Sequence, residues 1–201
     1  MFKFLHFCYI LLGLLLVPFL ILSILVHVLF RSHYFQAYLS RLGFHLPSVS
    51  ADNKQNVWIH AVSVGEITSC NPLIKILLEK GYNVYLSTTT PTGYETAEKL
   101  FPDVHLFYFP LDYGFIIKHL LHRIKPVKVI LVEMEFWPSF IYNVNNFDIP
   151  IYLVSGRLSD KDFSNYKRFR FFFSHYLELF SGLFMQSKED ADKMKKLTIN
   201  Q

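Results

Sequence analysis

Carboxylates stand at two points of the chain where they could take part in proton transfer or ligand binding. The first is Glu66, which follows the apolar run Val57–Val62 and a small turn that contains Ser63 and Gly65. At the predicted start of a helix, backbone N–H groups and the helix dipole favour an anion, and Glu66 could accept a proton from a sugar hydroxyl. A glutamate that only complements the helix dipole is the alternative. Gly65 would let the backbone approach a ligand closely.

The second point is the pair Glu133 and Glu135, which comes directly after the strongly apolar run Val129–Val132. If the extended backbone continues past that run, both side chains point to the same side. Two neighbouring acids can hold different pKa values or grip a ligand rich in hydroxyl groups. The alternative is that both are solvated loop residues, although the position of two acids directly after a buried strand then has no explanation.

Two further turns carry side chains that suit an anionic or hydroxylated ligand. Thr88–Gly93 holds four threonines, a proline and a glycine, and hydroxyls with backbone N–H groups at a strand-to-helix turn suit a phosphate, a carboxylate or a sugar. Helix capping by Thr92 and ordinary turn chemistry are the alternative. Arg157 is the cation in these turns that favours an anionic ligand, with a surface salt bridge as its alternative. The candidate contacts from the threonine turn are Thr89, Thr90, Thr92 and Gly93.

Other residue types argue against several kinds of site. His119 and His122 are spaced i, i+3 but lack a third ligand at metal spacing, so we predict no metal site. His60 lies in the first predicted strand and is interpreted as a satisfied core or rim histidine. Tyr166–Phe173 interleaves cations with aromatic residues, a pattern that fits RNA stacking, membrane-surface docking or core packing with snorkelling cations.

From Val57 onward, β-branched or aromatic runs alternate with helical patterns. The predicted strands are Val57–Val62, Tyr82–Thr88, Val104–Phe109, Val127–Val132, Ile149–Val154 and Leu183–Gln186. The predicted helices are Ile67–Lys80, Tyr94–Leu100, Phe115–Ile124, Ser139–Asn145, Asp160–Phe180 and one that begins near Lys188. Pro72 lies early in the first helix or at a kink within it. This alternation predicts right-handed βαβ units and a Rossmann-like α/β fold, with a mostly parallel sheet and flanking helices.

The fold prediction brings the candidate residues together. In an open parallel sheet, ligands bind outside the carboxyl ends of the strands. Glu66, the threonine turn, the Glu133–Glu135 pair and Arg157 all fall at those ends, whereas opposite loops such as Glu79–Asn83 carry ordinary turn residues. We therefore expect one site at this edge of the sheet.

The N-terminal segment predicts a membrane anchor. Phe7–Phe30 runs 24 residues without a formal charge, and as one helix it would be about 36 Å long, enough to cross a bilayer. A cleaved signal peptide is the alternative, but its apolar region should be shorter and end in a cleavage site. We predict one transmembrane helix within residues 1–30, an interfacial segment and linker over 31–56, and a domain over 57–201. A basic excess after the segment favours a cytoplasmic domain.

Composition excludes some partners. The net charge of +4 suits a neighbour of an anionic membrane but lacks the concentrated Lys/Arg block of a nucleic-acid binder. The two cysteines, Cys8 and Cys70, suggest neither a disulfide framework nor a zinc site, which is typical of a reducing compartment.

The motifs together resemble those of a known family. In order along the chain they are His60-Ala-Val-Ser-Val-Gly-Glu66, Thr88-Thr-Thr-Pro-Thr-Gly93, Pro110-Leu-Asp112, Glu133-x-Glu-x-Trp-Pro138, Arg157-Leu-Ser159 and Gln186-Ser187. The chain resembles the N-terminal half of the 3-deoxy-D-manno-octulosonic acid (Kdo) transferases of lipopolysaccharide synthesis. Met134 and Phe136 stand where that family usually has Thr and Leu, and Ser155-Gly156 stands where it usually has Asn-Ala.

The resemblance implies the N-terminal domain of a B-type glycosyltransferase at the cytoplasmic face of the cell inner membrane. Such an enzyme moves Kdo from CMP-Kdo to a hydroxyl of the lipid A precursor (lipid IVA), without a metal or other cofactor. Glu66 would be the proton acceptor and Glu133 would stabilise the transition state. The remaining candidates would contact the acceptor or the sugar: Ser63, Gly65, Thr89, Thr90, Thr92, Gly93, Glu135 and Arg157.

The resemblance also implies a second domain. Family members continue into a C-terminal domain that binds CMP and supplies a catalytic lysine, and this sequence stops at Gln201. We therefore expect little or no sugar transfer by the 201-residue chain alone. Two other hypotheses are a non-catalytic, membrane-anchored glycolipid-binding domain or remnant, and an unrelated sugar-nucleotide enzyme of similar fold.

Overall fold

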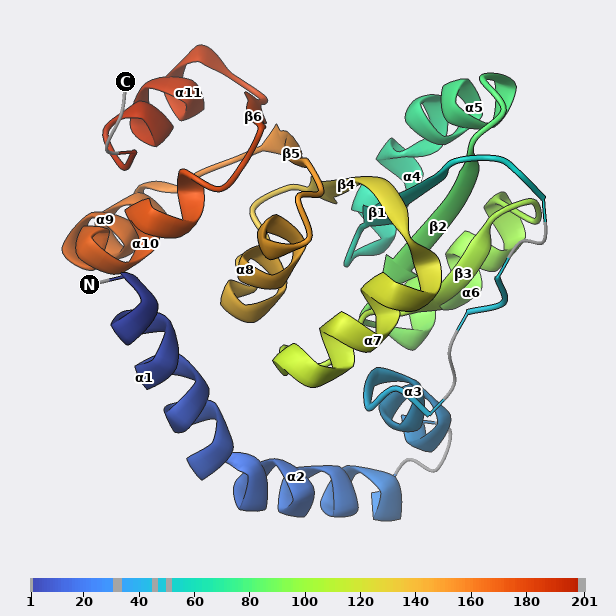
Figure 1. The fold of residues 1–201 in the computed structure, drawn as a ribbon, viewed down its shortest axis with the longest axis horizontal. Coiled ribbons are helices and arrows are strands. Elements are labelled where there is room, and N and C mark those ends of the chain that lie inside the picture. Colours follow the sequence, from blue (N-terminus) through green and yellow to red (C-terminus); the bar gives the residue numbers. More distant parts are fainter. Residues whose placement is uncertain (1, 31–33, 45–46, 50–51, 199–201) are drawn as a thin grey trace.

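A computed structural model of the protein describes residues 2–30, 34–44, 47–49 and 52–198. Its centre is a six-stranded sheet in the order β3-β2-β1-β4-β5-β6, and every neighbouring pair is parallel (Figure 1). The strands are β1 Asn56–His60, β2 Asn83–Thr88, β3 His105–Tyr108, β4 Pro126–Val132, β5 Ile151–Gly156 and β6 Gly182–Met185. The predicted parallel α/β sheet with flanking helices is confirmed.

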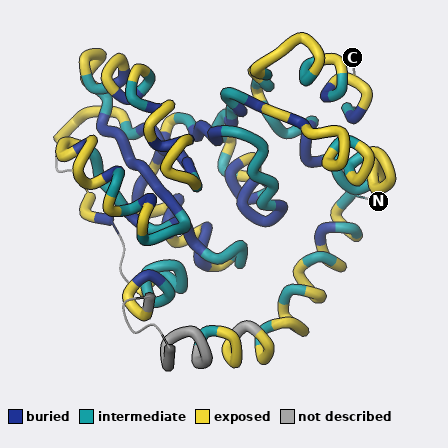
Figure 2. Tube along the Cα trace, turned by 180° about the vertical axis from the view of Figure 1, so that it is seen from behind, coloured by how far each residue is buried: buried dark blue, intermediate teal, exposed yellow. Residues whose placement is uncertain are grey.

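Each of the central strands buries both of its faces, because successive side chains point to opposite sides of the sheet. Trp58 and Val129 contribute to one core, and Ile59 and Ile130 contribute to the other. In the register, Ile59 lies between Leu86 of β2 and Ile130 of β4. Figure 2 shows the central strands as a buried layer between more exposed helices.

Two helical layers cover these faces. The first is built from α4 Val64–Ser69, α5 Asn71–Glu79 and α6 Pro91–Leu100. The second contains α7 Gly114–Ile124, α8 Pro138–Asn146, α9 Asp160–Arg168, α10 Arg170–Leu177 and α11 Lys188–Lys195. Because a helix comes after each β-strand, the turns at the carboxyl ends of the strands gather at one edge.

Two helices that the sequence predicts as continuous are broken. The pattern Ile67–Lys80 divides at Cys70, because Pro72 lacks the N–H that would continue the first helix and instead sits in the first turn of α5. The pattern Asp160–Phe180 divides at Phe169, whose ψ of 31° departs from helical geometry. Gly81, with a φ of +79°, lies just past the end of α5, where a left-handed backbone favours glycine.

The N-terminal segment is a bent pair of helices instead of the predicted single helix. α1 Phe2–Leu15 and α2 Val17–Phe30 meet at Leu16, where Pro18 has no N–H for the helical hydrogen bond and its ring crowds the preceding turn. Among the described residues, none of the helices taken singly has the length and apolar character to cross a bilayer. The pair Phe2–Leu15 and Val17–Ile24, bent by 41°, meets that test only when taken together.

α1 contacts α8 and α10 of the main body, and its N-terminal end lies beside α10 in Figure 1. His6 is buried, with Nδ1 2.9 Å from the hydroxyl of Tyr176 in α10, and the Phe2 ring lies edge-on to the same tyrosine. α3 Tyr34–Arg41 is a short helix within the predicted interfacial segment. Several residues of the predicted interfacial segment, linker and domain end lie outside the described residues: 31–33, 45–46, 50–51 and 199–201.

Candidate functional site

The turn after β1 is a capping box that fixes the carboxylate of Glu66. The Glu66 side chain is 6% exposed and accepts hydrogen bonds from the backbone N–H groups of Val62 (2.8 Å) and Ser63 (3.2 Å). In return, the hydroxyl of Ser63 accepts the N–H of Glu66 at 3.2 Å. This reciprocal pattern stabilises the start of α4 and holds the carboxylate in one orientation at the sheet edge. Ser63 and Gly65 are exposed beside it.

The threonine turn is fastened to the Glu66 turn. The hydroxyls of Thr88 and Thr90 both donate to the carbonyl of Val62, at 3.1 and 3.4 Å. Thr90 also caps α6, because its hydroxyl accepts the N–H of Gly93 at 3.1 Å. The interpretation of Thr92 as the cap is therefore wrong: α6 begins at Pro91, three residues before the predicted start, since proline is well suited to the first turn of a helix.

Gly93 holds the two turns in close contact. A Cβ atom at this position would lie 2.6 Å from the hydroxyl of Thr88, 2.8 Å from that of Thr90 and 3.0 Å from Cδ1 of Ile67. No heavy atom fits at those distances without movement of its neighbours. Gly93 is buried, whereas Thr89 and Thr90 are half-buried and Thr92 is exposed. Gly93 thus has a packing role, whereas Thr89, Thr90 and Thr92 reach the surface of this turn together with Pro91.

The turn after β4 has a different backbone from the predicted one. Glu133 has a φ of +58°, so the extended conformation ends at Val132. The N–H of Glu133 still donates to the carbonyl of Val154 in β5 (2.9 Å), and the N–H of Glu135 donates back to the carbonyl of Glu133 (3.1 Å). The premise that both acids share a side through strand alternation is therefore wrong. This left-handed backbone is costly for a glutamate.

Electrostatics nevertheless place both acids near Glu66. Burial raises the pKa of Glu135 to about 7, with further upward contributions from the charges of Glu66 and Glu133. Burial, and after it the charge of Glu66, also raises the pKa of Glu133, which the cation of Arg157 opposes. The sheet thus brings the two predicted acidic turns, 67 positions apart, into one electrostatic neighbourhood.

Trp137 borders this group of acids. Its indole N–H lies beside the Glu135 carboxyl and lowers the pKa of that group. The buried indole nitrogen nevertheless forms no hydrogen bond within the described part of the chain. A buried N–H group of this kind can still donate to a ligand atom.

A pocket of about 290 Å³ joins the second acidic turn to Arg157. Its lining consists of Glu133, Met134, Glu135, Arg157, Ser159 and Asp162. Arg157 is exposed and makes no salt bridge within the described residues, so the alternative of a surface salt bridge receives no support there. A cation beside two carboxyls can balance their charge or bind an anionic substituent of a ligand.

Two residues outside the predicted site set also hold this edge together, although Asp112 belongs to one of the motifs that carry the family resemblance. Arg41 of α3 donates from Nε to the carbonyl of Phe109 (3.1 Å), and burial lowers the pKa of its guanidinium. Asp112 accepts the backbone N–H groups of Ser139 (2.9 Å) and Phe140 (2.7 Å) at the start of α8. No local pattern marks these contacts, because the partners lie 27 or more positions away in the chain.

His60 lies in the core, as predicted, but its hydrogen bonding is incomplete, because the buried Nε2 has no partner within the described residues. It is fully buried, its ring stacks on Phe109 with centroids 3.8 Å apart, and its Nδ1 lies 3.0 Å from the carbonyl oxygen of Ser87. Burial lowers the pKa of its imidazole to about 3, so the ring is neutral and donates from Nδ1 to that carbonyl. Within the described residues, no group of three or more His, Cys, Asp or Glu is placed to hold a metal ion.

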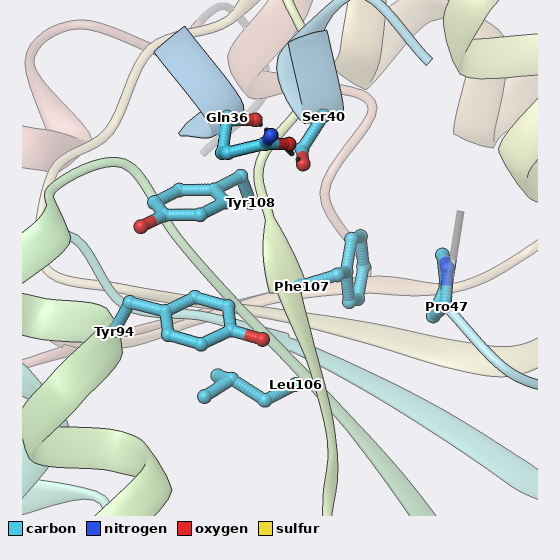
Figure 3. A pocket seen from close by; sticks show the side chains of 7 residues that line it. All are labelled: Gln36, Ser40, Pro47, Tyr94, Leu106, Phe107 and Tyr108. Atoms are coloured by element: carbon cyan, nitrogen blue, oxygen red, sulfur yellow. Dashed lines mark hydrogen bonds between the residues drawn. The ribbon is translucent and has the colours of Figure 1, made fainter. Parts of the chain in front are cut away.

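A separate pocket lies at the β3 edge of the sheet, away from the acidic turns (Figure 3). Tyr94 of α6 and Tyr108 of β3 stack there with ring centroids 4.7 Å apart, and Gln36 and Ser40 of α3 close one side. The residues that line it carry no charge and include none of the predicted site residues. We therefore assign it no part in the chemistry of the acidic turns.

Comparison with known proteins gives a consistent result. The family model described as "3-Deoxy-D-manno-octulosonic-acid transferase (kdotransferase)", an N-terminal glycosyltransferase family, matches residues 36–201. A bifunctional glycosyltransferase/methyltransferase of Fusobacterium nucleatum is 34% identical over 72% of this chain and 23% of its own length. The 3-deoxy-D-manno-octulosonic acid transferase of Haemophilus influenzae is 30% identical over 78% of this chain and 36% of its own length.

A third relative extends the match along the chain. The 3-deoxy-D-manno-octulosonic acid transferase of Chlamydia trachomatis is 29% identical over 83% of this chain and 42% of its own length. The chain therefore matches less than half the length of each of these three relatives. Among solved structures, UDP-GlcNAc 2-epimerase from Neisseria meningitidis bound to UDP-GlcNAc superposes with a TM-score of 0.52 at 12% identity. That match covers 70% of this chain and 43% of the epimerase and supports the fold alone.

Proposed function

This chain belongs to the 3-deoxy-D-manno-octulosonic-acid (Kdo) transferase family, and on that basis we propose that it forms the acceptor-binding part of an enzyme that transfers Kdo from CMP-Kdo to the lipid A precursor. The observation that carries the proposal is that Glu66 lies near enough to both acids of the Glu133–Glu135 turn, at the carboxyl edge of the sheet, for its charge to raise their pKa values. A glycosyl transfer needs carboxylates in such a group to take a proton and to balance developing positive charge.

In this proposal Glu66 takes the proton of the acceptor hydroxyl. The hydroxyl oxygen forms a bond to the anomeric carbon of Kdo as the bond from that carbon to the phosphate oxygen breaks, and CMP leaves with the electron pair. The two backbone N–H groups on the Glu66 carboxylate hold it still while it acts. Glu133 stabilises the positive charge that develops on the sugar ring.

Arg157 and Glu135 serve binding in the same proposal. Arg157 lies beside Glu133 and suits the carboxylate of Kdo or an anionic group of the acceptor. Because the pKa of Glu135 is about 7, this carboxyl carries a proton about half of the time near neutral pH. It can then donate as well as accept a hydrogen bond toward a sugar hydroxyl. The threonines of the turn before α6 supply further hydroxyls.

We propose that the protein works at the cytoplasmic face of the cell inner membrane, attached through the bent helix pair. Apolar side chains on α1 and α2 face outward, among them Phe4, Phe7 and Phe19, which are 60% or more exposed. A groove of about 390 Å³ between α1 and α10 is lined almost entirely by apolar residues. Beside it, three cations and no acidic residue occur between Tyr166 and Phe173, a charge pattern that suits an anionic bilayer.

The transfer proposal is tested with a chimera. The first part of the Haemophilus influenzae transferase is replaced by residues 1–201 of this chain, and Kdo transfer from CMP-Kdo to lipid A precursor is measured for the chimera and for the chain alone. We expect the chimera to transfer Kdo and the chain alone to transfer little. Glu66→Gln, which keeps the size of the side chain but not its basicity, should lower kcat by about 10²-fold or more.

Glu79→Gln, at an exposed carboxyl at the end of α5, is the matched control and should leave kcat unchanged. A folded Glu66→Gln chimera with normal turnover would remove Glu66 from the proton-transfer step. For the membrane proposal, deletion of residues 1–30 should abolish flotation of the protein with vesicles rich in anionic lipid. Continued flotation would assign attachment to the aromatic and basic residues of α9 and α10.

A further inference from the structure

A further cavity lies between α1 and the same edge of the sheet that carries the acids. It has a volume of about 430 Å³, which is within the usual range for small-molecule sites. One wall comes from α1, and the other comes from the turn after β3 and from the residues that begin α8. The apolar lining consists chiefly of Ile10, Gly13, Leu16, Leu111, Tyr113 and Trp137.

Three polar side chains that border this cavity are already engaged with the protein. The hydroxyl of Tyr9 donates to the carboxylate of Asp112 at 2.8 Å, and Asp112 also accepts two backbone N–H groups. The hydroxyl of Tyr113 donates to the carbonyl of Gly13 at 3.3 Å. A ligand that fills this cavity therefore contacts mainly apolar side-chain atoms, and its affinity comes from the burial of apolar surface.

Trp137 connects the cavity to the acidic site. Its ring lines the cavity, while its indole N–H lies beside the Glu135 carboxyl. On the opposite side, the cavity ends at α1, whose neighbouring residues Leu12, Leu14 and Leu15 are more than half exposed. The cavity thus lies between an outward-facing apolar helix and Trp137, whose indole N–H lies beside the Glu135 carboxyl.

We propose that this cavity holds an acyl chain of the glycolipid acceptor, with the sugar end of that lipid beyond Trp137 at the carboxyl edge. The inference rests on the proposed function for the identity of the lipid, but not for the binding of an acyl chain. α1 then serves as one wall of the acceptor site as well as a membrane attachment. Its contacts with the body of the protein, through His6 and Tyr9, keep that wall in place.

The binding step is tested on the full chain with palmitic acid brominated at mid-chain, because bromine quenches tryptophan fluorescence at short range. The protein has two tryptophans: Trp137 lines the cavity and Trp58 is fully buried in the core. We expect saturable quenching of about half the tryptophan emission, and we expect this quenching to be absent in Trp137→Phe. Unbrominated palmitic acid should reverse the quenching, whereas butyric acid should not. Quenching that does not saturate, or that persists in Trp137→Phe, would overturn the proposal.

A cavity-filling variant provides the second arm. A Cβ at Gly13 would face the Tyr113 ring at 3.9 Å, so Gly13→Phe places its ring in the cavity and should weaken palmitate binding by about tenfold or more. Leu11→Phe, on an exposed part of α1 outside the cavity, should leave it unchanged. Urea unfolding of each variant confirms that the fold is retained. Equal palmitate affinity in folded Gly13→Phe and wild type would overturn the proposal.

The chimera distinguishes the acceptor from bilayer lipid as the source of the chain. Gly13→Phe should raise KM for the acylated acceptor and leave KM unchanged for the same acceptor with its acyl chains removed. A rise in KM for both acceptors, or for neither, would overturn the assignment to the acceptor. Failure of the chimera to transfer any Kdo would instead contradict the proposed function, and the quenching result on the chain alone would still decide whether the cavity binds an acyl chain.

Discussion

The turns after β1 and β4 deliver carboxylates to the same neighbourhood by different means. The Glu66 turn satisfies its own hydrogen bonds: a capping box closes it, and two threonine hydroxyls tie its backbone to the next turn. The Glu133 turn stores strain, with a left-handed glutamate, a carboxyl whose pKa is about 7 and a buried indole nitrogen without a partner among the described residues. The first turn is held by its own hydrogen bonds, whereas the second contains a strained backbone and a polar group without a partner among the described residues.

The largest expected effect tests the rigidity of the first region. Gly93→Ala places a methyl group within 2.6–3.0 Å of Thr88, Thr90 and Ile67 and should lower the free energy of unfolding by about 2–3 kcal/mol. Gly65→Ala is the matched control, since its Cβ would meet only the Ser63 hydroxyl at 3.8 Å. In helix α4 it should raise stability by about 0.5 kcal/mol. Urea unfolding measures the free energy of unfolding of both variants. Equal changes in the two variants would contradict the packing role of Gly93.

The next effect concerns the capping hydroxyl. Thr90→Ala removes the acceptor for the Gly93 N–H and a donor to Val62, which should cost about 1–2 kcal/mol. Thr92→Ala changes an exposed threonine one residue inside the helix and should cost less than about 0.5 kcal/mol. Thermal unfolding of the two variants decides between them, and a larger loss in Thr92→Ala would restore Thr92 as the cap.

A pH-dependent effect tests the second region. The pKa of Glu135 rises from 4.5 to about 7 on folding, so its favourable contribution to stability is complete below pH 4.5 and is lost as the pH rises through 7. Glu135→Gln should therefore be more stable than wild type at pH 8, by about 1 kcal/mol after allowance for solvent screening, with no such gain at pH 5. Glu79→Gln should show no pH-dependent gain, and a pH-independent difference for Glu135→Gln would contradict the raised pKa.

The smallest effect measures the strain at Glu133. Glu133→Asn and Glu133→Ala both remove the carboxylate, but only asparagine readily tolerates a φ of +58°. The asparagine variant should be more stable than the alanine variant by about 0.5 kcal/mol. Chemical denaturation at one pH compares them directly. Identical stabilities would show that the left-handed turn stores little energy.

The same two regions show how far sequence reasoning reaches. The Glu66 turn could be predicted because a capping box is a local pattern in which Ser63 and Glu66 lie three residues apart. The strands and their parallel pairing follow from the alternation of β-branched runs with helical patterns along the chain. The backbone of Glu133 could not be predicted, because its conformation is set by packing between β4 and β5. The contacts of Arg41 and Asp112 join segments that no local pattern relates.

The breaks within the predicted helices could not be predicted for a related reason. Leu16, Cys70 and Phe169 interrupt patterns that remain amphipathic or apolar on both sides, so periodicity alone does not reveal the bend. Pro18 and Pro72 are the local signals for two of them. The break at Phe169 has no such signal; there the chain turns α10 so that Tyr176 meets His6 and Phe2 of α1.

Asp112 links the N-terminal helix α1 to the start of α8, which follows the Glu133–Glu135 turn. The first turn of α8 has no side-chain cap of its own, and the Asp112 carboxylate supplies one while it also receives the phenol of Tyr9 from α1. Displacement of α1 would therefore also disturb the hydrogen bonds that fix the start of α8, next to the segment that contains Trp137 and Glu135. The position of α1 and the geometry of the segment before α8 are therefore coupled through the single carboxylate of Asp112.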